Sequence, residues 1–230
     1  SLSSQVEDTT KNIYNSFDGR KSYIPRSVAG HRVEYHISNQ LKFSAKEIVI
    51  FGNRKIDENY LLPFIPFWSM QHYIGDIDNV QMCAEINWAS KQKPLSLYSS
   101  IFIDEWRPEW TFKSKNRNWF GYLIGINSSE IIFPKDNIKI EYIWTDHRIY
   151  RHKFKINSSY THNYPIGFWA GPHSEYLLVN YFITHNKHTF EFDFSFFKRG
   201  ELTQAMIENQ YNDINESYSR YNGSSETRML

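Results

Sequence analysis

The residues that could carry out chemistry are loop carboxylates, loop histidines and one cysteine. Residues 75–79 read Gly-Asp-Ile-Asp-Asn, which brings two carboxylates and an amide together, as a calcium loop does. The run lacks the further ligands and the distal glutamate of an EF-hand loop. A turn that closes a long loop uses the same residue types. We therefore expect a turn at this position and no bound metal ion.

Few of these residues are arranged like an enzyme active site. Asp104 and Glu105 are adjacent in an expected strand, so their side chains point to opposite faces and cannot easily flank one glycosidic bond. The four histidines of residues 146–174 lack the spacing of metal ligands. The chain contains neither a Gly-x-Ser-x-Gly nucleophile elbow nor a glycine-rich phosphate loop. We expect a protein that is not an enzyme and uses no cofactor.

Charge and composition exclude several functional classes. The 230 residues carry a formal net charge of +1, which gives no electrostatic reason to expect a nucleic-acid partner. The single cysteine, Cys83, excludes an intramolecular disulfide framework and a cysteine zinc cluster. Aromatic residues are abundant, with 16 Tyr, 17 Phe and 7 Trp. No apolar run approaches the ~18–20 residues that a membrane-spanning helix requires.

The element that must position these residues is the β-strand, and residues 189–197 show it most clearly. Four phenylalanines, at every second position from 190 to 196, alternate with polar and acidic residues. Successive side chains of a strand point to opposite faces, so one face here is aromatic and the other polar. The pattern fits a half-buried strand of a soluble sheet. It equally fits a membrane barrel strand, with the rings against lipid.

The same alternation predicts eight strands. They cover residues 31–37, 41–51, 80–89, 94–104, 118–127, 138–145, 175–184 and 189–197. Long connections at 52–79, 105–117 and 146–174 alternate with short turns, apart from an intermediate one at 128–137. Long loops at one end and short turns at the other are typical of a transmembrane barrel. A soluble up-and-down barrel or a sandwich remains the alternative.

Two further sets of residues follow from the barrel interpretation. Aromatic residues near strand ends would form interfacial girdles: Tyr35, Trp88, Trp119, Trp144 and Tyr176. Charged residues on the opposite face would form a polar network in the lumen: Arg32, Glu34, Glu47, Glu85, Glu141, Glu191 and Asp193. Such a set could line a pore, and we favour a closed network of paired charges.

Several short segments follow one another along the chain in a recognisable order. The longest is residues 60–79, which begins Tyr-Leu-Leu-Pro and ends Gln-His-Tyr-Ile-Gly-Asp-Ile-Asp-Asn. The others are 31–35 (HRVEY), Glu47, 97–98 (LY), 103–105 (IDE), 141–142 (EY), 150–152 (YRH), 165–167 (PIG), 171–172 (GP) and 199–201 (RGE). Taken in order, these segments resemble the Wzi-type capsule assembly family of bacterial outer-membrane proteins, and the resemblance covers about residues 30–201.

The resemblance implies an antiparallel up-and-down transmembrane β-barrel in the bacterial outer membrane. Its external surface would hold capsular or other exported polysaccharide in a lectin-like manner, and outer-membrane lipid would surround it. Family barrels have more strands than the eight expected here, so we expect a partial, monomeric copy of a larger barrel. The alternatives are an outer-membrane diffusion channel and a soluble β-sandwich that binds carbohydrate.

Polysaccharide binding would use aromatic rings that stack on sugars, with polar groups that bond the hydroxyls. The long loops supply the candidates Trp68, Tyr73, Trp106, Arg107, Trp110, Tyr164 and Trp169. We expect residues 1–29 to be a polar leader or loop and residues 30–200 to be the barrel segment. Residues 201–230 would form a polar tail or loop, with a possible short helix.

Overall fold

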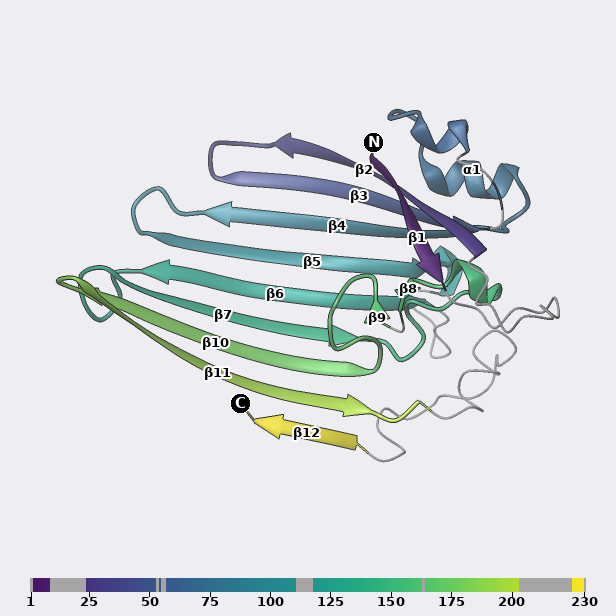
Figure 1. Cartoon of the computed structure of the whole chain (residues 1–230). Coiled ribbons are helices and arrows are strands. Elements are labelled where there is room, and N and C mark those ends of the chain that lie inside the picture. The colour runs from purple at the N-terminus through teal and green to yellow at the C-terminus, as the bar shows by residue number, and fades with distance from the viewer. Residues whose placement is uncertain are drawn as a thin grey trace. The chain divides into compact units, whose positions relative to one another are not determined.

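The computed structural model describes residues 2–8, 24–52, 54, 57–110, 118–162, 164–202 and 225–229. Its main feature is a mostly antiparallel sheet of ten strands in the order β1-β2-β3-β4-β5-β6-β7-β10-β11-β12, so neighbours in the sheet follow chain order (Figure 1). Within the described residues this sheet does not close on itself. No helix in the described part of the chain is long and apolar enough to cross a membrane.

The ten strands differ in length, and the eight central ones are the longest. Their bounds are β1 Leu2–Asp8, β2 Ile24–His36, β3 Leu41–Gly52, β4 Asn79–Ala89, β5 Leu95–Glu105, β6 Trp119–Ser129, β7 Asp136–Thr145, β10 Ser174–His185, β11 His188–Gly200 and β12 Ser225–Met229. The connections carry helix α1 (Phe67–Tyr73), the 3-10 turns η1 (Glu58–Leu61), η2 (Pro108–Trp110) and η3 (Lys155–Asn157), and the small sheet β8 (Tyr160–Thr161) with β9 (Tyr164–Pro165).

The chain forms two compact units. The first unit contains residues 1–32, 46–82 and 150–171, and therefore most of the long-loop elements. The second unit contains residues 33–45, 83–149 and 172–230, and therefore most of the long strands.

In the second unit, every second residue of five neighbouring strands lies on the same side of the sheet, and most of these residues are apolar. One continuous row joins Leu97, Ile126, Ile140, Val179 and Phe194 across β5, β6, β7, β10 and β11. The name apolar face is used below for this row and its neighbours on the same side. These are Ile101, Ile103, Phe120, Tyr122, Ile124, Ile138, Tyr142, Trp144, Leu177, Tyr181, Ile183, Phe190, Phe192 and Phe196.

The apolar face is open to solvent in the second unit. Phe190, Phe192 and Phe194 are 53%, 61% and 45% exposed, and Ile124 is 61% exposed. A soluble domain normally buries such a face against another layer. The expected alternation along residues 189–197 is therefore confirmed, and it leaves the rings uncovered.

The opposite side of these strands, called the polar face below, carries polar side chains and two glycines, together with apolar residues such as Leu123, Ile143 and Leu178. Gly125 pairs with Tyr98 on one side and Glu141 on the other. The Tyr98 ring lies over Gly125, because a Cβ at that glycine would be 2.2 Å from the ring. The Tyr98 hydroxyl then donates a hydrogen bond to Glu141 Oε1 at 2.7 Å. A side chain at position 125 would block this crossing of three strands.

Four short turns of the second unit lie side by side, and they are called the turn rim below: residues 37–40, 90–94, 130–135 and 186–187. Hydrogen bonds to the next strand link them. The Gln40 carbonyl accepts from the Ala89 N–H at 2.8 Å, the Pro94 carbonyl from the Ser129 N–H at 2.9 Å, and the Lys135 carbonyl from the Thr184 N–H at 3.3 Å. The four turns are visible together at the left of Figure 1.

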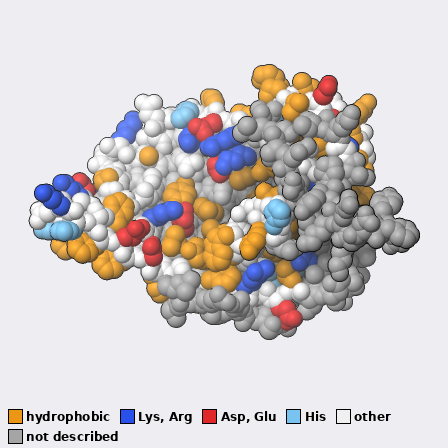
Figure 2. All heavy atoms as spheres, in the orientation of Figure 1, with side chains coloured by type: hydrophobic (Ala, Val, Ile, Leu, Met, Phe, Trp, Pro, Cys, Tyr) orange, Lys and Arg blue, Asp and Glu red, His pale blue; other side chains and the backbone are white. Residues whose placement is uncertain are grey.

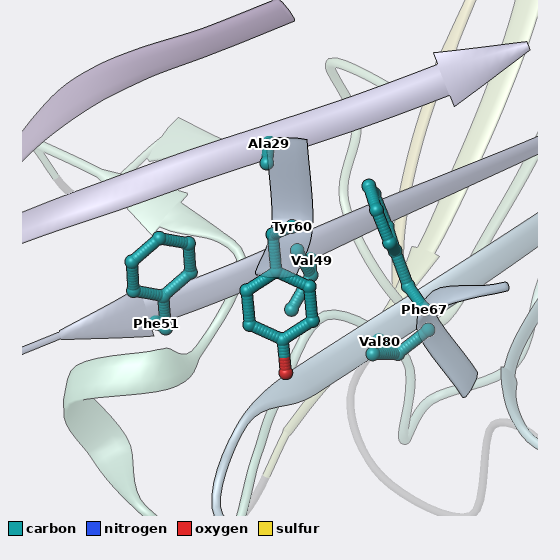
Figure 3. Close-up of a cluster of buried hydrophobic side chains, with 6 residues drawn as sticks. All are labelled: Ala29, Val49, Phe51, Tyr60, Phe67 and Val80. Atoms are coloured by element: carbon teal, nitrogen blue, oxygen red, sulfur yellow. The ribbon is translucent and has the colours of Figure 1, made fainter. Parts of the chain in front are cut away.

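The first unit has the compact apolar core. Ala29, Val49, Phe51, Tyr60, Phe67 and Val80 are buried together (Figure 3). Helix α1 joins this core along one side, because Phe67, Met70 and Ile74 lie three and four residues apart and pack against the cluster. Pro66 precedes the helix and caps it without a side-chain hydrogen bond.

All eight expected strands are present, since regular alternation over seven or more residues is a strong strand signal, and their ends lie within three residues of expectation except that β2 begins seven residues earlier, at Ile24. Two expectations need correction. β1 and the start of β2 lie within residues 1–29, which we expected to be a leader or loop. Trp119 and Tyr176 were expected on the lipid side with the other girdle residues, but the register sets them on the polar face. The possible helix after residue 201 lies outside the described residues.

Candidate functional site

Four of the seven expected polysaccharide-binding residues lie in the first unit. Trp68 and Tyr73 belong to α1, and their side chains are 44% and 88% exposed. Tyr164 in β9 and the nearby Trp169 are 73% and 59% exposed. The sequence alone did not suggest that Trp68 and Tyr73 share a helix, because the run around residues 61–68 contains two prolines. α1 and the β8–β9 hairpin occupy separate places in Figure 1, and by their positions in the chain the four residues are treated as two pairs, Trp68 with Tyr73 and Tyr164 with Trp169.

The other three expected residues, Trp106, Arg107 and Trp110, lie in the second unit after β5. Trp106 and Arg107 have exposed side chains, and the Arg107 backbone N–H donates to Asn118 Oδ1 at 2.7 Å. Trp110 ends the turn η2, and its side chain lies outside the described part of the structure. No single cluster of all seven residues is therefore established.

Each exposed pair in the first unit has an aromatic or polar neighbour that orients it. The Trp68 ring lies 4.4 Å from the His72 ring, and His72 Nδ1 is 2.8 Å from the Trp68 carbonyl oxygen. The Trp169 ring lies 5.7 Å from the Phe168 ring. The Phe168 N–H in turn donates to the buried Tyr150 hydroxyl at 3.0 Å. These contacts hold open aromatic surfaces without covering them.

The segment that carries Tyr164 and Trp169 is held by Arg26. This arginine is only 1% exposed, and its guanidinium donates to the carbonyl oxygens of Ile156 and Ser158 at 2.8 Å each. It also donates to the Tyr160 carbonyl oxygen. A guanidinium presents several donors in a rigid fork, which suits three carbonyls of one loop. Neither alternation nor a motif could have indicated this role for Arg26 in the sequence.

The segment that carries α1 is held by a buried cluster around Asp78. Both carboxylate oxygens of Asp78 accept from the Arg54 guanidinium, at 2.9 and 2.5 Å, and the Tyr60 hydroxyl donates to the same carboxylate at 2.7 Å. Burial and the hydrogen bond to Asp78 raise the pKa of Tyr60. Burial alone would lower the pKa of Arg54, but its hydrogen bond to Asp78 and the nearby charge raise it overall. The cluster therefore keeps a neutral tyrosine and an ion pair together.

The position of Asp78 explains the acidic run at residues 75–79. Asp78 is fully buried in its contacts with Arg54 and Tyr60, whereas Asp76 adopts a positive φ of 56° in the turn. Within this run, Asp78 therefore belongs to the buried cluster, whereas Asp76 forms part of the turn. Among the described residues there is no group of three or more His, Cys, Asp or Glu side chains that could hold a metal ion.

Glu47, expected in the lumen network, instead links β3 to helix α1. Its Oε2 accepts from the Phe67 N–H at 2.8 Å and lies 2.9 Å from His31 Nε2. The His31 ring lies 4.1 Å from the Phe67 ring. A carboxylate beside the first N–H groups of a helix satisfies donors that have no partner within the helix.

The remaining expected lumen residues form local pairs on the polar side of their strands. Lys42 Nζ is 3.4 Å from Glu34 Oε1, and the Ser44 hydroxyl donates to Glu85 at 2.9 Å. Lys139 lies 3.0 Å from Glu141, and the Asn180 amide donates to Glu191 and Asp193 at 2.8 and 2.6 Å. Arg32 has an exposed side chain in the first unit. Lys139 and Glu141 both belong to β7, whereas the other contacts join adjacent strands, so all of these contacts are local.

One buried histidine of the first unit, His152, has a lowered pKa. His152 is 7% exposed, and its Nδ1 accepts from the Phe154 N–H at 3.2 Å. Burial, together with the charge of Lys153, lowers the pKa of His152 to about 4. The ring is therefore neutral at pH 7, with its proton on Nε2.

Comparison of the chain with protein-family models, with curated proteins and with solved structures found no match.

Proposed function

We propose that this chain is a membrane-spanning segment of an outer-membrane β-barrel that takes part in the assembly or surface attachment of capsular or other exported polysaccharide. The long loops would bind the glycan through their exposed aromatic residues. The bound polymer would be retained without chemical change. The resemblance to the Wzi-type family suggested this function, and three features of the structure support it.

The apolar face carries the proposal. Leu97, Ile126, Ile140, Val179 and Phe194 continue one another across five strands, and most of their neighbours on that side are apolar, with polar exceptions such as Ser99, Ser128 and Asp136. Lipid is the environment in which such a face needs no protein layer to cover it. Tyr122 and Trp144, with ring centroids 5.5 Å apart, lie near the long-loop ends of their strands. Aromatic pairs of this kind suit the membrane–water interface.

The connections support an orientation for the proposed barrel. Outer-membrane barrels keep short turns on the periplasmic side and long loops outside the cell. By this rule the turn rim would face the periplasm, and the connections that contain α1, η2 and the β8–β9 hairpin would face the exterior. Exported polysaccharide would then meet the loop aromatics.

The loop scaffolds support glycan binding by preorganisation. Arg26 and the cluster around Asp78 fix the backbone behind the two aromatic pairs of the first unit. Binding to a rigid surface avoids the entropic cost of ordering a loop. Tyr73 and Tyr164, with 88% and 73% exposure, would be the most accessible stacking platforms among these four residues.

The diffusion channel remains a second candidate because of the polar face. Lys139 keeps a side-chain exposure of 40%, and Asn180, Glu191 and Asp193 are grouped on the same side. A water-filled lumen would use such residues. The sandwich alternative receives no such support, because Phe190, Phe192 and Phe194 are exposed.

Membrane partition tests the barrel part of the proposal. The full chain, expressed with an outer-membrane targeting signal, should fractionate with the outer membrane and migrate faster on gels before boiling than after it. A chain that is monodisperse in buffer without detergent would refute the barrel. Ion conductance through the folded protein in planar bilayers would favour the channel over glycan retention.

Glycan retention tests the loop part. Trp68→Ala combined with Tyr73→Ala should weaken retention of exported polysaccharide by folded protein, as should Tyr164→Ala combined with Trp169→Ala. Phe43→Ala removes an exposed aromatic ring from β3, outside the long loops and the turn rim, and serves as the matched control. Unchanged retention in both double variants would exclude these residues as the binding site.

A further inference from the structure

The turn rim of the second unit combines positive charge with an exposed apolar tip. Its four turns carry four lysines, Lys91, Lys93, Lys135 and Lys187, and one glutamate, Glu130. All five side chains are exposed. None of the lysines forms an ion pair with another residue in the described ranges. The whole chain has a formal net charge of only +1, so positive charge is concentrated at this rim.

The apolar tip belongs to the turn between β6 and β7. Ile131, Ile132 and Phe133 are 52%, 66% and 55% exposed. The Asp136 carboxylate accepts their three backbone N–H groups at 2.8, 2.9 and 2.9 Å, and the Tyr181 hydroxyl donates to it at 3.0 Å. The turn is therefore held in one conformation while its apolar side chains project into solvent.

The tip and the lysines are neighbours along one edge. Hydrogen bonds connect the turn 90–94 to the end of β6, and Lys135 to β10, which leads into the turn 186–187. In Figure 2, lysine and histidine side chains gather at the left-hand end, where the β10–β11 turn lies in Figure 1, with apolar side chains beside them. Phe190, the first phenylalanine of the apolar face in β11, follows Lys187 by three residues.

We propose that the turn rim binds the headgroup layer of a membrane that contains anionic phospholipid, with Ile131, Ile132 and Phe133 inserted at the interface and the four lysines on lipid phosphates. This inference rests on the proposed membrane barrel and adds a lipid preference to it. Long lysine side chains lay their methylene groups on apolar surface and extend the ammonium group to phosphates.

Two observations favour this occupant over an acidic protein. The rim is continuous with the apolar face, so whatever surrounds that face also reaches the lysines. Its lysines are also spread over three turns, each separated by two strands or about 10 Å, which suits a fluid layer of headgroups better than one peptide. Near an anionic leaflet each lysine strengthens binding by about fivefold.

The test uses the full chain, folded into bilayers of phosphatidylcholine alone, phosphatidylglycerol alone, or an equal mixture. After mild extraction from the mixture, native mass spectrometry should find phosphatidylglycerol enriched among the retained lipids. Lys91→Gln with Lys93→Gln should reduce that enrichment severalfold, and Lys135→Gln with Lys187→Gln should do the same. Lys153→Gln with Lys155→Gln, two exposed loop lysines of the first unit, is the matched control and should leave it unchanged.

Three results would overturn the inference. The first is equal retention of phosphatidylcholine and phosphatidylglycerol by the unaltered chain. The second is a phosphatidylglycerol enrichment that remains unchanged in all three double variants. Binding of soluble hexaglutamate that depends on the rim lysines, without lipid enrichment, would reassign the rim to an acidic protein segment. A chain that folds in phosphatidylcholine without lipid preference refutes only this inference, whereas a chain that inserts into none of the bilayers refutes the barrel itself.

Discussion

At the scale of single residues, a few buried polar side chains hold the long loops in place. Arg26 joins β2 to loop carbonyls that lie 130, 132 and 134 residues further along the chain. Asp78 gathers Arg54 and Tyr60 behind helix α1. A buried charge depends on the hydrogen bonds and charges around it, so each of these residues is sensitive to substitution.

Arg26→Met should release the loop 150–171. The change leaves the carbonyls of Ile156, Ser158 and Tyr160 without the donors that they use now, and it should cost about 3 kcal/mol in the local free energy of unfolding. Hydrogen exchange at residues 156–160 measures the loss. Arg26→Lys keeps the charge with fewer directed donors, so it should give an intermediate rate. Equal exchange in all three proteins would contradict the clamp.

His152 should make the same loop sensitive to acid. Its pKa in the folded protein is about 4, below the ordinary value of 6.5, so the unfolded loop binds the proton more readily. Stability is then fully present above pH ~6.5 and is lost as the pH falls towards 4, by about 3 kcal/mol in all. Hydrogen exchange of residues 150–160 against pH measures this loss.

The control for acid sensitivity is a pair of substitutions. His152→Asn keeps a hydrogen-bond acceptor near the Phe154 N–H but cannot be protonated in this range, so it should flatten the pH profile. His162→Asn alters an exposed histidine of the same loop and should leave the profile unchanged. A profile that stays steep in His152→Asn would assign the acid sensitivity to another group.

At the scale of elements, the polar face depends on close approach between strands. Tyr98 crosses Gly125 to reach Glu141, so three neighbouring strands are linked by one side chain. Glycine within a strand weakens it unless another group approaches closely, and here the Tyr98 ring does so. Gly121 pairs with Phe102 in the same strand pair but has ordinary contact distances.

Alanine at these two glycines should therefore have opposite effects. In Gly125→Ala the new Cβ would meet the Tyr98 ring at 2.2 Å, which should displace the ring and cost about 1–3 kcal/mol. In Gly121→Ala the nearest atom is 3.5 Å away, so the change should be neutral or stabilising by up to about 1 kcal/mol. Urea unfolding in detergent compares the two. Equal effects would show that Tyr98 does not occupy this position.

At the scale of the whole molecule, five neighbouring strands of the sheet, β5, β6, β7, β10 and β11, have two chemically different faces. The apolar face continues through five strands without a polar interruption in the row from Leu97 to Phe194. On the polar face the side chains pair locally, within one strand for Lys139 and Glu141 of β7 and between strands for Asn180 with Glu191 and Asp193. A sheet with this division separates two solvents, and the proposed pair is lipid and water.

A lysine placed on each face in turn measures which side meets lipid. Phe192→Lys puts a charge on the apolar face and should cost about 2–4 kcal/mol of folding free energy in a bilayer. Asn180→Lys puts the same charge on the polar face beside Glu191 and Asp193, where it should cost little or add stability. Unfolding titrations in phosphatidylcholine vesicles compare the variants. Equal costs would contradict the assignment of the faces.

The sequence by itself predicted the eight long strands and the side on which most of their residues lie, with Trp119 and Tyr176 as exceptions. This information is local, because the side-chain direction alternates with every residue of a strand. It could not determine β1 or β12. In β1, Leu2 and Val6 provide no alternation, and the strand depends on pairing with β2, as β12 depends on pairing with β11. It also missed α1, whose apolar spacing becomes clear only where Phe67, Met70 and Ile74 meet the core.

The tertiary structure alone decided which candidate residues come together. Trp68 and Tyr73 share a helix, Tyr164 and Trp169 share a segment held by Arg26, and Trp106 with Arg107 belongs to the second unit. Contacts between residues more than a hundred positions apart leave no periodic trace in the chain. They arise when the folded backbone brings unpaired carbonyls and a buried guanidinium within hydrogen-bonding distance, and only the three-dimensional arrangement records that.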